Sequence, residues 1–457
     1  MKKRTVSYII SLAMALSFLA SGCGSTAINT DGDMSAENTE DSAGDKENSS
    51  MESDLPAANG QTVIRFVNTK AEIDKGLKIL SSKYEEISGV KVVVETLQSG
   101  QDSQSVLKGY YNSGNMPDIF MFEGDIQYNS WKNIMVDMSG EKWTYDTESE
   151  YIKDGKVYGF PITTEAIGLT YNADILEKAG IDPGSITGPE SMAAAFEKLD
   201  SMKKELGLKA VIGYYTEAAN LWWSAGQHIF GTYLDSGLKR DDTTYIDLLN
   251  DGGQLDEERL LAFADMIALF NKYTDKNGVS GTYDEQIAGF AQGQYAFVTQ
   301  GSWIGAVLMN DDADLYADAG SFEIGMVPYA FIEGQDTIQT NCPSWLVINK
   351  NGNVNAAKAF FEWCADNNGG QEILATECGL ISPFYSSTYK PVDPFAQTIE
   401  DYTTRGKTSA WHWQSWKDGL AQNATCIVFR DFAKGDINSS EDFAYKLQDA
   451  VEAYYLK

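Results

Sequence analysis

The sequence is poor in the residues that many enzymes use for catalysis and metal binding. Only two histidines, His228 and His412, occur in 457 residues, and no HExxH motif or Cys/His pattern has zinc spacing. A G-x-S-x-G nucleophile elbow and a GxxxxGK[ST] phosphate loop are also absent from the sequence. We therefore predict no metal, no cofactor and no catalytic residue. Because aspartate and glutamate are abundant, a glycosidase with paired carboxylates stays open at this point.

Basic residues are scarce as well. The chain has 35 lysines and arginines against 66 aspartates and glutamates, which gives a net charge of −31. This charge argues against nucleic acid and anionic lipid surfaces as partners. No two cysteines have CxxC spacing, and beyond Cys23 the cysteines are Cys342, Cys364, Cys378 and Cys426. Four cysteines allow three disulfide pairings, and we favour buried free thiols.

Long hydrophobic runs are limited to the N-terminus. Residues 6–20 are apolar, follow a basic start and are too short for a good membrane span. With the small residues before Cys23, they predict a signal peptide over residues 1–22 and resemble a bacterial lipobox, whose cysteine is lipidated. Ala20 departs from the lipobox, which usually has leucine there. The alternative is an ordinary signal peptide with an incidental cysteine.

The segment after Cys23 lacks the residues of a hydrophobic core. Residues 23–60 contain nine acidic residues, one lysine and no aromatic residue. Such a composition buries too little apolar surface to fold by itself. We therefore predict a disordered, self-repelling acidic tether behind the lipidated cysteine.

Hydrophobic periodicity places folded structure from residue 62 onward. Strands are predicted at 62–68, 90–96 and 118–122, with a short helix at 106–111. Between the first two strands, one helix face is predicted to hold Ile73, Leu77, Leu80, Tyr84 and Ile87, and Gly89 to end the helix. This strand–helix alternation predicts a parallel sheet with right-handed crossovers.

Three later helices have the same kind of apolar face. Their predicted core positions are Leu260, Ala264, Ile267 and Phe270; Ala357, Phe360, Phe361 and Cys364; and Phe443, Leu447, Val451 and Tyr454. A chain of 457 residues is too long for one ordinary core. The sequence therefore predicts an α/β protein with more than one lobe.

All ten tryptophans lie in the predicted folded part, and several lie outside regular core patterns. Trp222 and Trp223 are adjacent, so they could not face one core from a strand. Trp303 lies in a glycine-flanked segment, whereas Trp363 lies on a helix and is predicted to be core. Exposed indole faces could stack on sugar rings while carboxylates and amides bind the hydroxyls. The alternative is that these side chains fill large cores.

Four motifs occur in the order found in a known family. They are SGNMPDIFMFEGD (113–125), DGKVYGFPITTEAIGLTYNADILEKAGI (154–181), FAQGQYAFVTQGSWI (290–304) and SWLVINKNGNVNAAKAFFEW (344–363). The chain from residue 61 onward resembles the extracellular solute-binding proteins of ABC importers, especially the carbohydrate branch that includes maltose-binding protein.

The resemblance implies a periplasmic-binding-protein-like fold of two α/β lobes, joined by hinge crossovers, with a ligand cleft between them. The expected first lobe comprises residues 61–163 and 340–392. The second is expected to comprise residues 166–337 and 395–457.

The same resemblance implies the ligand-binding residues. Glu165 aligns with a glutamate that accepts hydrogen bonds from sugar hydroxyls, and Trp303 aligns with a stacking platform. A structural role bonded to backbone amides is the alternative for Glu165. Further expected ligand residues are Trp222, Trp223, Trp411, Trp413, Trp345, Glu123, Asp125, Asn68 and Lys70.

The resemblance finally implies the function. We expect a monomeric sugar-binding lipoprotein that captures an oligosaccharide by lobe closure and delivers it unchanged to membrane permease subunits. A lipid anchor with a long tether fits the outer face of the cytoplasmic membrane in a Gram-positive cell. Two alternatives remain: the same fold with a non-sugar solute such as a polyamine, and a surface glycosidase or adhesin.

Overall fold

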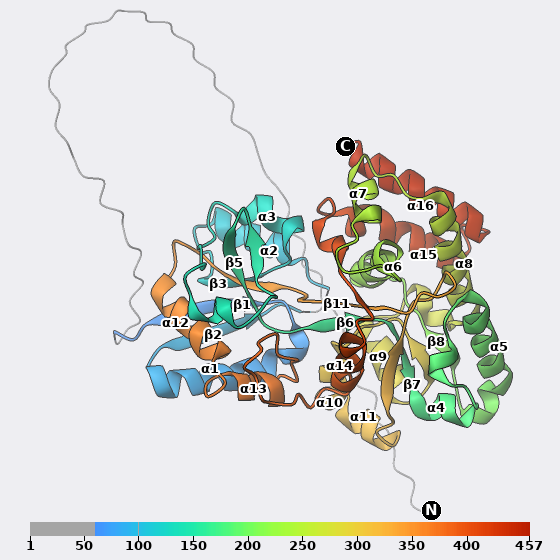
Figure 1. Ribbon diagram of the computed structural model, residues 1–457, viewed down its shortest axis with the longest axis horizontal. Helices are drawn as coiled ribbons and strands as arrows, with labels where there is room; N and C mark the ends of the chain where they lie inside the picture. Colours follow the sequence, from blue (N-terminus) through green and yellow to red (C-terminus); the bar gives the residue numbers. More distant parts are fainter. Residues whose placement is uncertain (1–59, 99) are drawn as a thin grey trace, which may run out of the picture. The chain divides into compact units, whose positions relative to one another are not determined.

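The computed structural model describes residues 60–98 and 100–457. The predicted signal peptide, the lipidation site Cys23 and tether residues 23–59 lie outside the described residues. Three β-sheets organise the described part (Figure 1). We name the six-stranded sheet A, the four-stranded sheet B and the three-stranded sheet C.

Sheet A is built from the early part of the chain and one late strand. Its strands, in spatial order, are β2 (Lys91–Thr96), β1 (Val63–Asn68), β3 (Ile119–Phe122), β12 (Trp345–Ile348), β5 (Lys156–Pro161) and β4 (Tyr151–Lys153). β1 pairs in parallel with β2 and β3, as the alternating pattern predicts. β12 is antiparallel to both β3 and β5, so the whole sheet is mixed.

The helices of this part include α1, whose apolar face was predicted. These helices are α1 (Asp74–Ser88), α2 (Ser103–Asn112), α3 (Asp125–Trp131), α12 (Val354–Ala365) and α13 (Gln371–Thr376). Leu77, Leu80 and Tyr84 are buried, and Gly89 ends α1 with φ +73°, a conformation that glycine adopts without strain. The prediction for Ile87 is wrong: this side chain is 55% exposed, because the core beneath α1 ends at Tyr84.

Sheet B and its helices come mainly from the middle and the end of the chain. The strands, in spatial order, are β10 (Ile324–Val327), β7 (Leu169–Asn172), β9 (Tyr295–Val298) and β8 (Ala210–Gly213). The α-helices are α4 (Ala173–Lys178), α5 (Pro189–Leu206), α6 (Phe230–Asp235), α7 (Thr244–Asn250), α8 (Glu257–Tyr273), α9 (Tyr283–Ala291), α10 (Ile304–Met309), α11 (Ala313–Asp318), α14 (Ala396–Thr404), α15 (Cys426–Lys434) and α16 (Ser440–Tyr455). The predicted core faces of α8 and α12 are buried, as is that of α16 except for the half-buried Tyr454.

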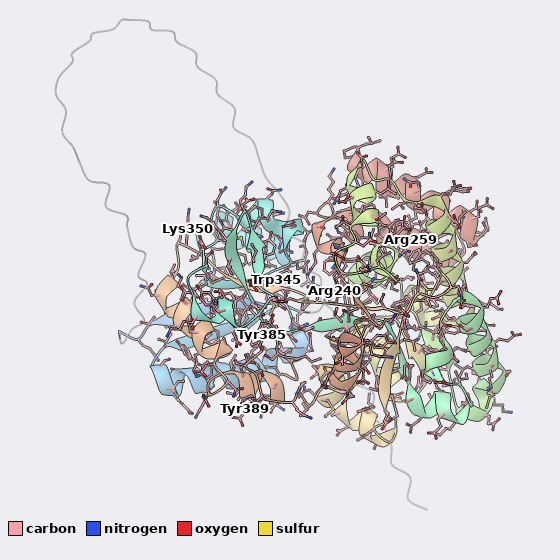
Figure 2. All side chains as sticks on the ribbon, in the orientation of Figure 1. Arg240, Arg259, Trp345, Lys350, Tyr385 and Tyr389 are labelled. Carbon is pink, nitrogen blue, oxygen red and sulfur yellow. The ribbon has the colours of Figure 1, made fainter. Side chains whose placement is uncertain are left out.

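Sheet C lies between the other two sheets (Figure 1) and consists of β13 (Thr408–Ser409), β11 (Ile338–Asn341) and β6 (Glu165–Ile167). Glu165 opens β6 opposite Asn341. Arg240, labelled in Figure 2, donates from Nη1 to the carbonyl oxygens of Thr340 (2.7 Å) and Ser409 (3.0 Å). This guanidinium therefore ties β11 to β13 beside the crossover strand that carries Glu165.

The buried hydrophobic side chains gather in separate clusters around sheets A and B. The two clusters at sheet A draw their buried members from residues 64–162 and 342–384. The two clusters at sheet B draw theirs from residues 166–338 and 395–451. The predicted lobe boundaries stay a prediction, and this division of the cores is the observation that bears on them.

The four described cysteines, Cys342, Cys364, Cys378 and Cys426, are buried free thiols, which confirms the interpretation favoured from their spacing. Within the described ranges, no helix combines the length and the apolar character that a membrane span requires.

Candidate functional site

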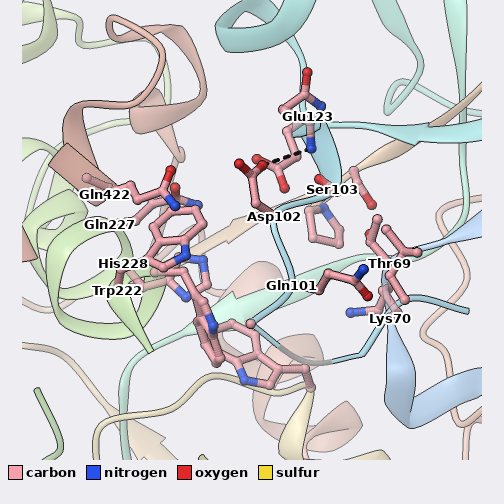
Figure 3. A pocket seen from close by; sticks show the side chains of 18 of the residues that line it. Thr69, Lys70, Gln101, Asp102, Ser103, Glu123, Trp222, Gln227, His228 and Gln422 are labelled. Carbon is pink, nitrogen blue, oxygen red and sulfur yellow. Dashed lines mark hydrogen bonds between the residues drawn. The ribbon is translucent and has the colours of Figure 1, made fainter. Parts of the chain in front are cut away.

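A cavity of about 710 Å³ lies between segments of sheet A and segments of sheet B. One side, which we name the polar wall, comprises residues 69–72, 97–98, 100–104, Lys108 and Glu123. The other side, the aromatic wall, comprises Trp222, Trp223, His228, Tyr283, Trp303, Trp411, Trp413 and Trp416. In Figure 3, Trp222 and His228 face Lys70, Asp102 and Glu123 across the cavity.

An ion-paired cluster occupies the end of the polar wall next to sheet C. Lys70 Nζ lies 2.6 Å from Glu165 Oε1 and 2.7 Å from Glu72 Oε1. Burial opposes the charge on Lys70, but the carboxylates of Glu165 and Glu72 outweigh it and raise the pKa of Lys70. Burial raises the pKa of Glu165 despite the pairing with Lys70. Glu165 therefore lines the cavity, and its partner is a lysine side chain rather than backbone amides.

Glu123 carries a second unusual carboxyl group on the polar wall. It follows β3 and precedes Gly124, whose φ of +85° turns the chain sharply at the cavity. Burial raises the pKa of Glu123 to about 7, and the charges of Asp418 and Asp102 add to this effect. Asp102 itself caps helix α2 by accepting from the backbone amides of Gln104 and Ser105.

The aromatic wall is a contiguous set of rings centred on His228. The His228 ring lies 4.8 Å from Trp303 and 5.5 Å from both Trp223 and Trp413, measured between centroids. Trp411 stacks on Trp413 at 5.8 Å. Such rings provide large apolar faces at fixed positions, which suits the C–H face of a sugar ring.

Buried hydrogen bonds hold Trp303 in place. Its Nε1 donates to Gln300 Oε1 (3.1 Å), and Gln300 Nε2 donates to Gln286 Oε1 (2.8 Å) and Ser224 Oγ (3.0 Å). Gly301 permits this arrangement, because a Cβ there would lie 2.2 Å from the Trp303 ring. The glycine before the tryptophan and the amide relay behind it together fix the orientation of this indole.

Two π-helical segments carry other cavity residues. Ser224–Ile229 bears His228, and Ala421–Thr425 bears Gln422. The two segments pack closely, and Thr425 Oγ1 donates to the Gly226 carbonyl (2.5 Å). Gly226 allows this approach, because a Cβ at this position would clash with the backbone nitrogen of Cys426. A π-helical turn re-aims side chains relative to an α-helix and occurs often at functional sites.

Several ring nitrogens of the aromatic wall have no hydrogen-bond partner within the described part of the chain. These buried atoms are Nε1 of Trp222, Trp411, Trp413 and Trp416, and Nδ1 of His228. A buried polar group without a partner costs free energy. The aromatic wall therefore combines apolar faces with uncommitted polar nitrogens, which suits a ligand that is itself amphipathic.

The structure brings most of the sequence-predicted ligand residues together at the cavity. These are Lys70, Glu123, Glu165, Trp222, Trp223, Trp303, Trp411 and Trp413. Three others do not line it. Asn68 is fully buried and bonds Thr96 Oγ1 and the Lys70 carbonyl, and the Asp125 carboxylate pairs with Lys153.

Trp345 is the third residue away from the cavity. It opens β12 as predicted, but its Nε1 donates to the Ser149 carbonyl (2.6 Å), and its ring lies against Gly124 and Gly159. Figure 2 shows it within the sheet A part of the molecule. Trp345 thus supports the turn that presents Glu123.

Sequence reasoning missed several cavity residues. These include His228, Gln227, Tyr283, Trp416, Asp102, Asp418 and Gln422. The one signal that could have singled out His228 was its rarity: it is one of two histidines, and it lies five residues after the tryptophan pair. The amide and carboxylate positions gave no such signal, because these residue types are common throughout the chain.

Comparison with known proteins places this geometry in a family. The multiple sugar-binding protein of Streptococcus mutans is 22% identical over 394 residues, which cover 82% of this chain and 88% of that protein. The melibiose/raffinose/stachyose-binding protein MelE of Bacillus subtilis is 28% identical over 151 residues. That match spans 32% of this chain and only 33% of MelE.

Solved structures establish the fold. RafE in complex with raffinose has a TM-score of 0.67 at 18% identity, covering 86% of this chain and 99% of RafE. A Bacillus licheniformis sugar transporter protein in complex with stachyose has a TM-score of 0.65 at 16% identity, covering 85% and 98%. The expected periplasmic-binding-protein-like α/β fold is confirmed. The family profile of the bacterial extracellular solute-binding proteins matches residues 80–404, more than half of the sequence, and the chain therefore belongs to this family.

Proposed function

We propose that this protein is the substrate-binding lipoprotein of an ABC importer that captures an oligosaccharide and delivers it to membrane permease subunits. The observation that carries this proposal is the cavity, in which rings on one side face hydrogen-bonding groups on the other. A sugar ring has apolar C–H faces and a polar rim of hydroxyls, so it matches both walls at once. The sugar-binding names of the relatives support the same substrate class.

Binding proceeds by closure of two lobes over the ligand. The proposed lobes are residues 61–163 with 340–392, and residues 166–337 with 395–457. The separate hydrophobic clusters around sheets A and B support this division, because each lobe then keeps its own core. A ligand that contacts both walls favours the closed arrangement by its differential contacts.

The proposed ligand residues are the eight predicted ones that line the cavity. Glu165 and Glu123 accept from hydroxyls, and Lys70 donates. Trp222, Trp223, Trp303, Trp411 and Trp413 provide stacking and wall surfaces. We propose no catalytic residue: the sugar leaves the site chemically unchanged.

The proposed location is the outer face of the cytoplasmic membrane. There, a lipid on Cys23 and the acidic tether would hold a monomeric receptor close to its permease. The description of the family as extracellular supports an exported protein. Lipid anchoring and a Gram-positive host rest on the sequence pattern alone.

Thermal melting of the purified protein against a ligand panel tests this function. The panel holds monosaccharides, raffinose, stachyose, chitin oligosaccharides, amino acids, peptides and polyamines. A ligand at about 100 times its Kd stabilises the fold by roughly 2.7 kcal/mol. Stabilisation by one oligosaccharide series, with the sugar recovered intact, supports the proposal.

Polyamines belong in the panel because carboxylates outnumber lysines around the cavity. The acidic side chains are Glu72, Asp102, Glu123, Glu165, Asp284, Asp311, Asp312 and Asp418, against Lys70 and Lys108. If only polyamines stabilise the protein, the proposed sugar ligand is wrong, but the family assignment stands. Hydrolysis of the sugar would overturn the assignment as a transport receptor.

A further inference from the structure

His228 is a half-buried polar side chain with a buried Nδ1 atom, in an otherwise aromatic environment. Its ring contacts Trp223, Trp303, Trp411 and Trp413 at centroid distances between 4.8 and 6.1 Å. The side chain lines the cavity and points into it from the π-helix Ser224–Ile229 (Figure 3). A tightly packed apolar wall has no structural need for an imidazole at this position.

The imidazole is neutral at physiological pH. Burial lowers the pKa of His228 to about 3, and the positive charge of Lys70 on the polar wall lowers it further. A neutral imidazole has one N–H donor and one bare nitrogen acceptor. The indoles around it can only donate. His228 is therefore the one ring of the aromatic wall, as defined above, that can both donate and accept through nitrogen.

Among the described residues, nothing pairs with the Nδ1 atom of His228, which is buried. The other histidine, His412, shows the opposite arrangement: its Nδ1 lies 2.5 Å from Asp235 Oδ1, outside the set of cavity residues. The chain thus has one histidine committed to a structural ion pair and one left uncommitted at the cavity.

We propose that His228 binds and selects a ligand hydroxyl at the centre of the aromatic wall. A hydroxyl group both donates and accepts hydrogen bonds, and it therefore matches the donor and the acceptor of a neutral imidazole. A carboxylate can only accept and an ammonium group can only donate, so each matches one of the two nitrogens. The inference rests on the proposed function and adds a specificity-determining residue to it. Sugars that lack the contacted hydroxyl bind more weakly, and the loss is confined to that ring position.

Isothermal titration calorimetry tests the proposal with His228→Phe and His228→Gln. The probe is raffinose, or the panel oligosaccharide that stabilises the wild-type protein most. Phenylalanine keeps the ring but cannot hydrogen-bond, so affinity falls roughly 10- to 100-fold. Glutamine keeps a donor and an acceptor and recovers a large part of that loss. Equal affinity in the wild type and His228→Phe overturns the proposal.

Nuclear magnetic resonance of the two imidazoles provides a second, independent readout. Because the chain has only two histidines, the variants assign each signal. Without ligand, the His228 signals stay constant between pH 5 and 8. The His412 signals titrate above pH 6.5, because the hydrogen bond to Asp235 raises the pKa of His412. Saturating sugar shifts the His228 signals and leaves those of His412 in place.

The outcomes separate this inference from the proposed function. If wild-type protein binds an oligosaccharide but the His228 signals do not move, the role of His228 is wrong and the importer function stands. If the wild type binds no sugar of the panel, the proposed function and the hydroxyl contact both fail. If His228→Gln binds no better than His228→Phe, His228 acts by packing and not by hydrogen bonding.

Discussion

The two walls of the cavity differ in whether their polar groups have ion-pair or hydrogen-bond partners among the described residues. On the polar wall, Lys70 is paired with two carboxylates, and Asp102 caps a helix. On the aromatic wall, buried nitrogens of Trp222 and His228 have no partner among the described residues. The polar wall therefore holds its own geometry without ligand, whereas the aromatic wall gains most from one. Affinity should therefore depend more strongly on the aromatic wall, and stability more strongly on the polar wall.

Removal of Lys70 should have the largest effect on stability. In Lys70→Met, Glu165 and Glu72 lose their cation in a poorly exposed site, and the free energy of unfolding should fall by about 3 kcal/mol. Urea denaturation without ligand measures this. Because the pKa of Lys70 is raised, its contribution is complete below about pH 10.5 and is lost as pH rises further.

The matched control is Lys78→Met. Lys78 makes an ion pair of the same length with Asp74 (2.6 Å), but its side chain is 63% exposed. Such a pair contributes between about 0 and 1 kcal/mol. Equal losses in the two variants would show that the polar wall is not held by its ion pairs.

Removal of Trp303 should lower affinity within the range expected for His228→Phe. Trp303→Ala deletes a half-buried ring that contacts His228 and Trp223, and binding should weaken by about 2 kcal/mol, roughly 30-fold. Titration calorimetry with the identified sugar measures this. Trp363→Ala is the control: Trp363 packs on Tyr84 and Phe360 away from the cavity, so it should lower stability and leave affinity unchanged.

The amide relay behind Trp303 should matter less than the ring itself. Gln300→Met removes the acceptor for Trp303 Nε1, and we expect a loss of about 1 kcal/mol in binding, together with a changed indole fluorescence spectrum. Gln286→Met breaks the relay one step further back, where Gln286 accepts from Gln300 Nε2 and donates to the Gly213 carbonyl. It should destabilise the fold with a smaller change in affinity. A larger loss of affinity in Gln286→Met would exclude Gln300 as the residue that orients the indole.

The sequence could predict elements whose burial depends on their own residues. Period-3.6 and alternating patterns predict α1, α8 and the first three strands of sheet A, β1, β2 and β3, because burial acts on each element locally. The prediction failed for Ile87, whose environment depends on where the neighbouring core ends.

The residues of the candidate site also differ in whether the sequence could predict them. Trp303 and Glu165 lie in motifs of contiguous residues, so a resemblance to known proteins finds them. His228 and Asp418 reach the cavity through packing between segments distant in sequence, and Gly226 next to the π-helix at 421–425 is one such contact. Trp345 shows the converse case: it lies in a family motif, but it does not line the cavity and its ring packs against Gly124 behind Glu123.

The smallest predicted effect is a pH dependence that originates on the polar wall. Burial, with Asp418 and Asp102, raises the pKa of Glu123 from 4.5 to about 7. Between these pH values the unfolded chain has lost this proton and the folded protein still holds it. Because the unfolded state then binds fewer protons, stability falls as pH rises from 4.5 to 7. Glu123→Gln removes this contribution.

Urea denaturation at pH 5 and pH 7.5 measures this effect of Glu123. The free energy of unfolding should fall between these pH values by about 1 kcal/mol less in Glu123→Gln than in the wild type. Glu86→Gln, at an exposed position on α1, should follow the wild type. Asp418 lines the cavity two residues after Trp416 of the aromatic wall, so ionisation of Glu123 adds a repulsion between these two carboxylates. A ligand that donates hydrogen bonds to Glu123 relieves this repulsion. The pH dependence should therefore shrink when sugar is bound, and its persistence at saturating sugar would place Glu123 outside the contact surface.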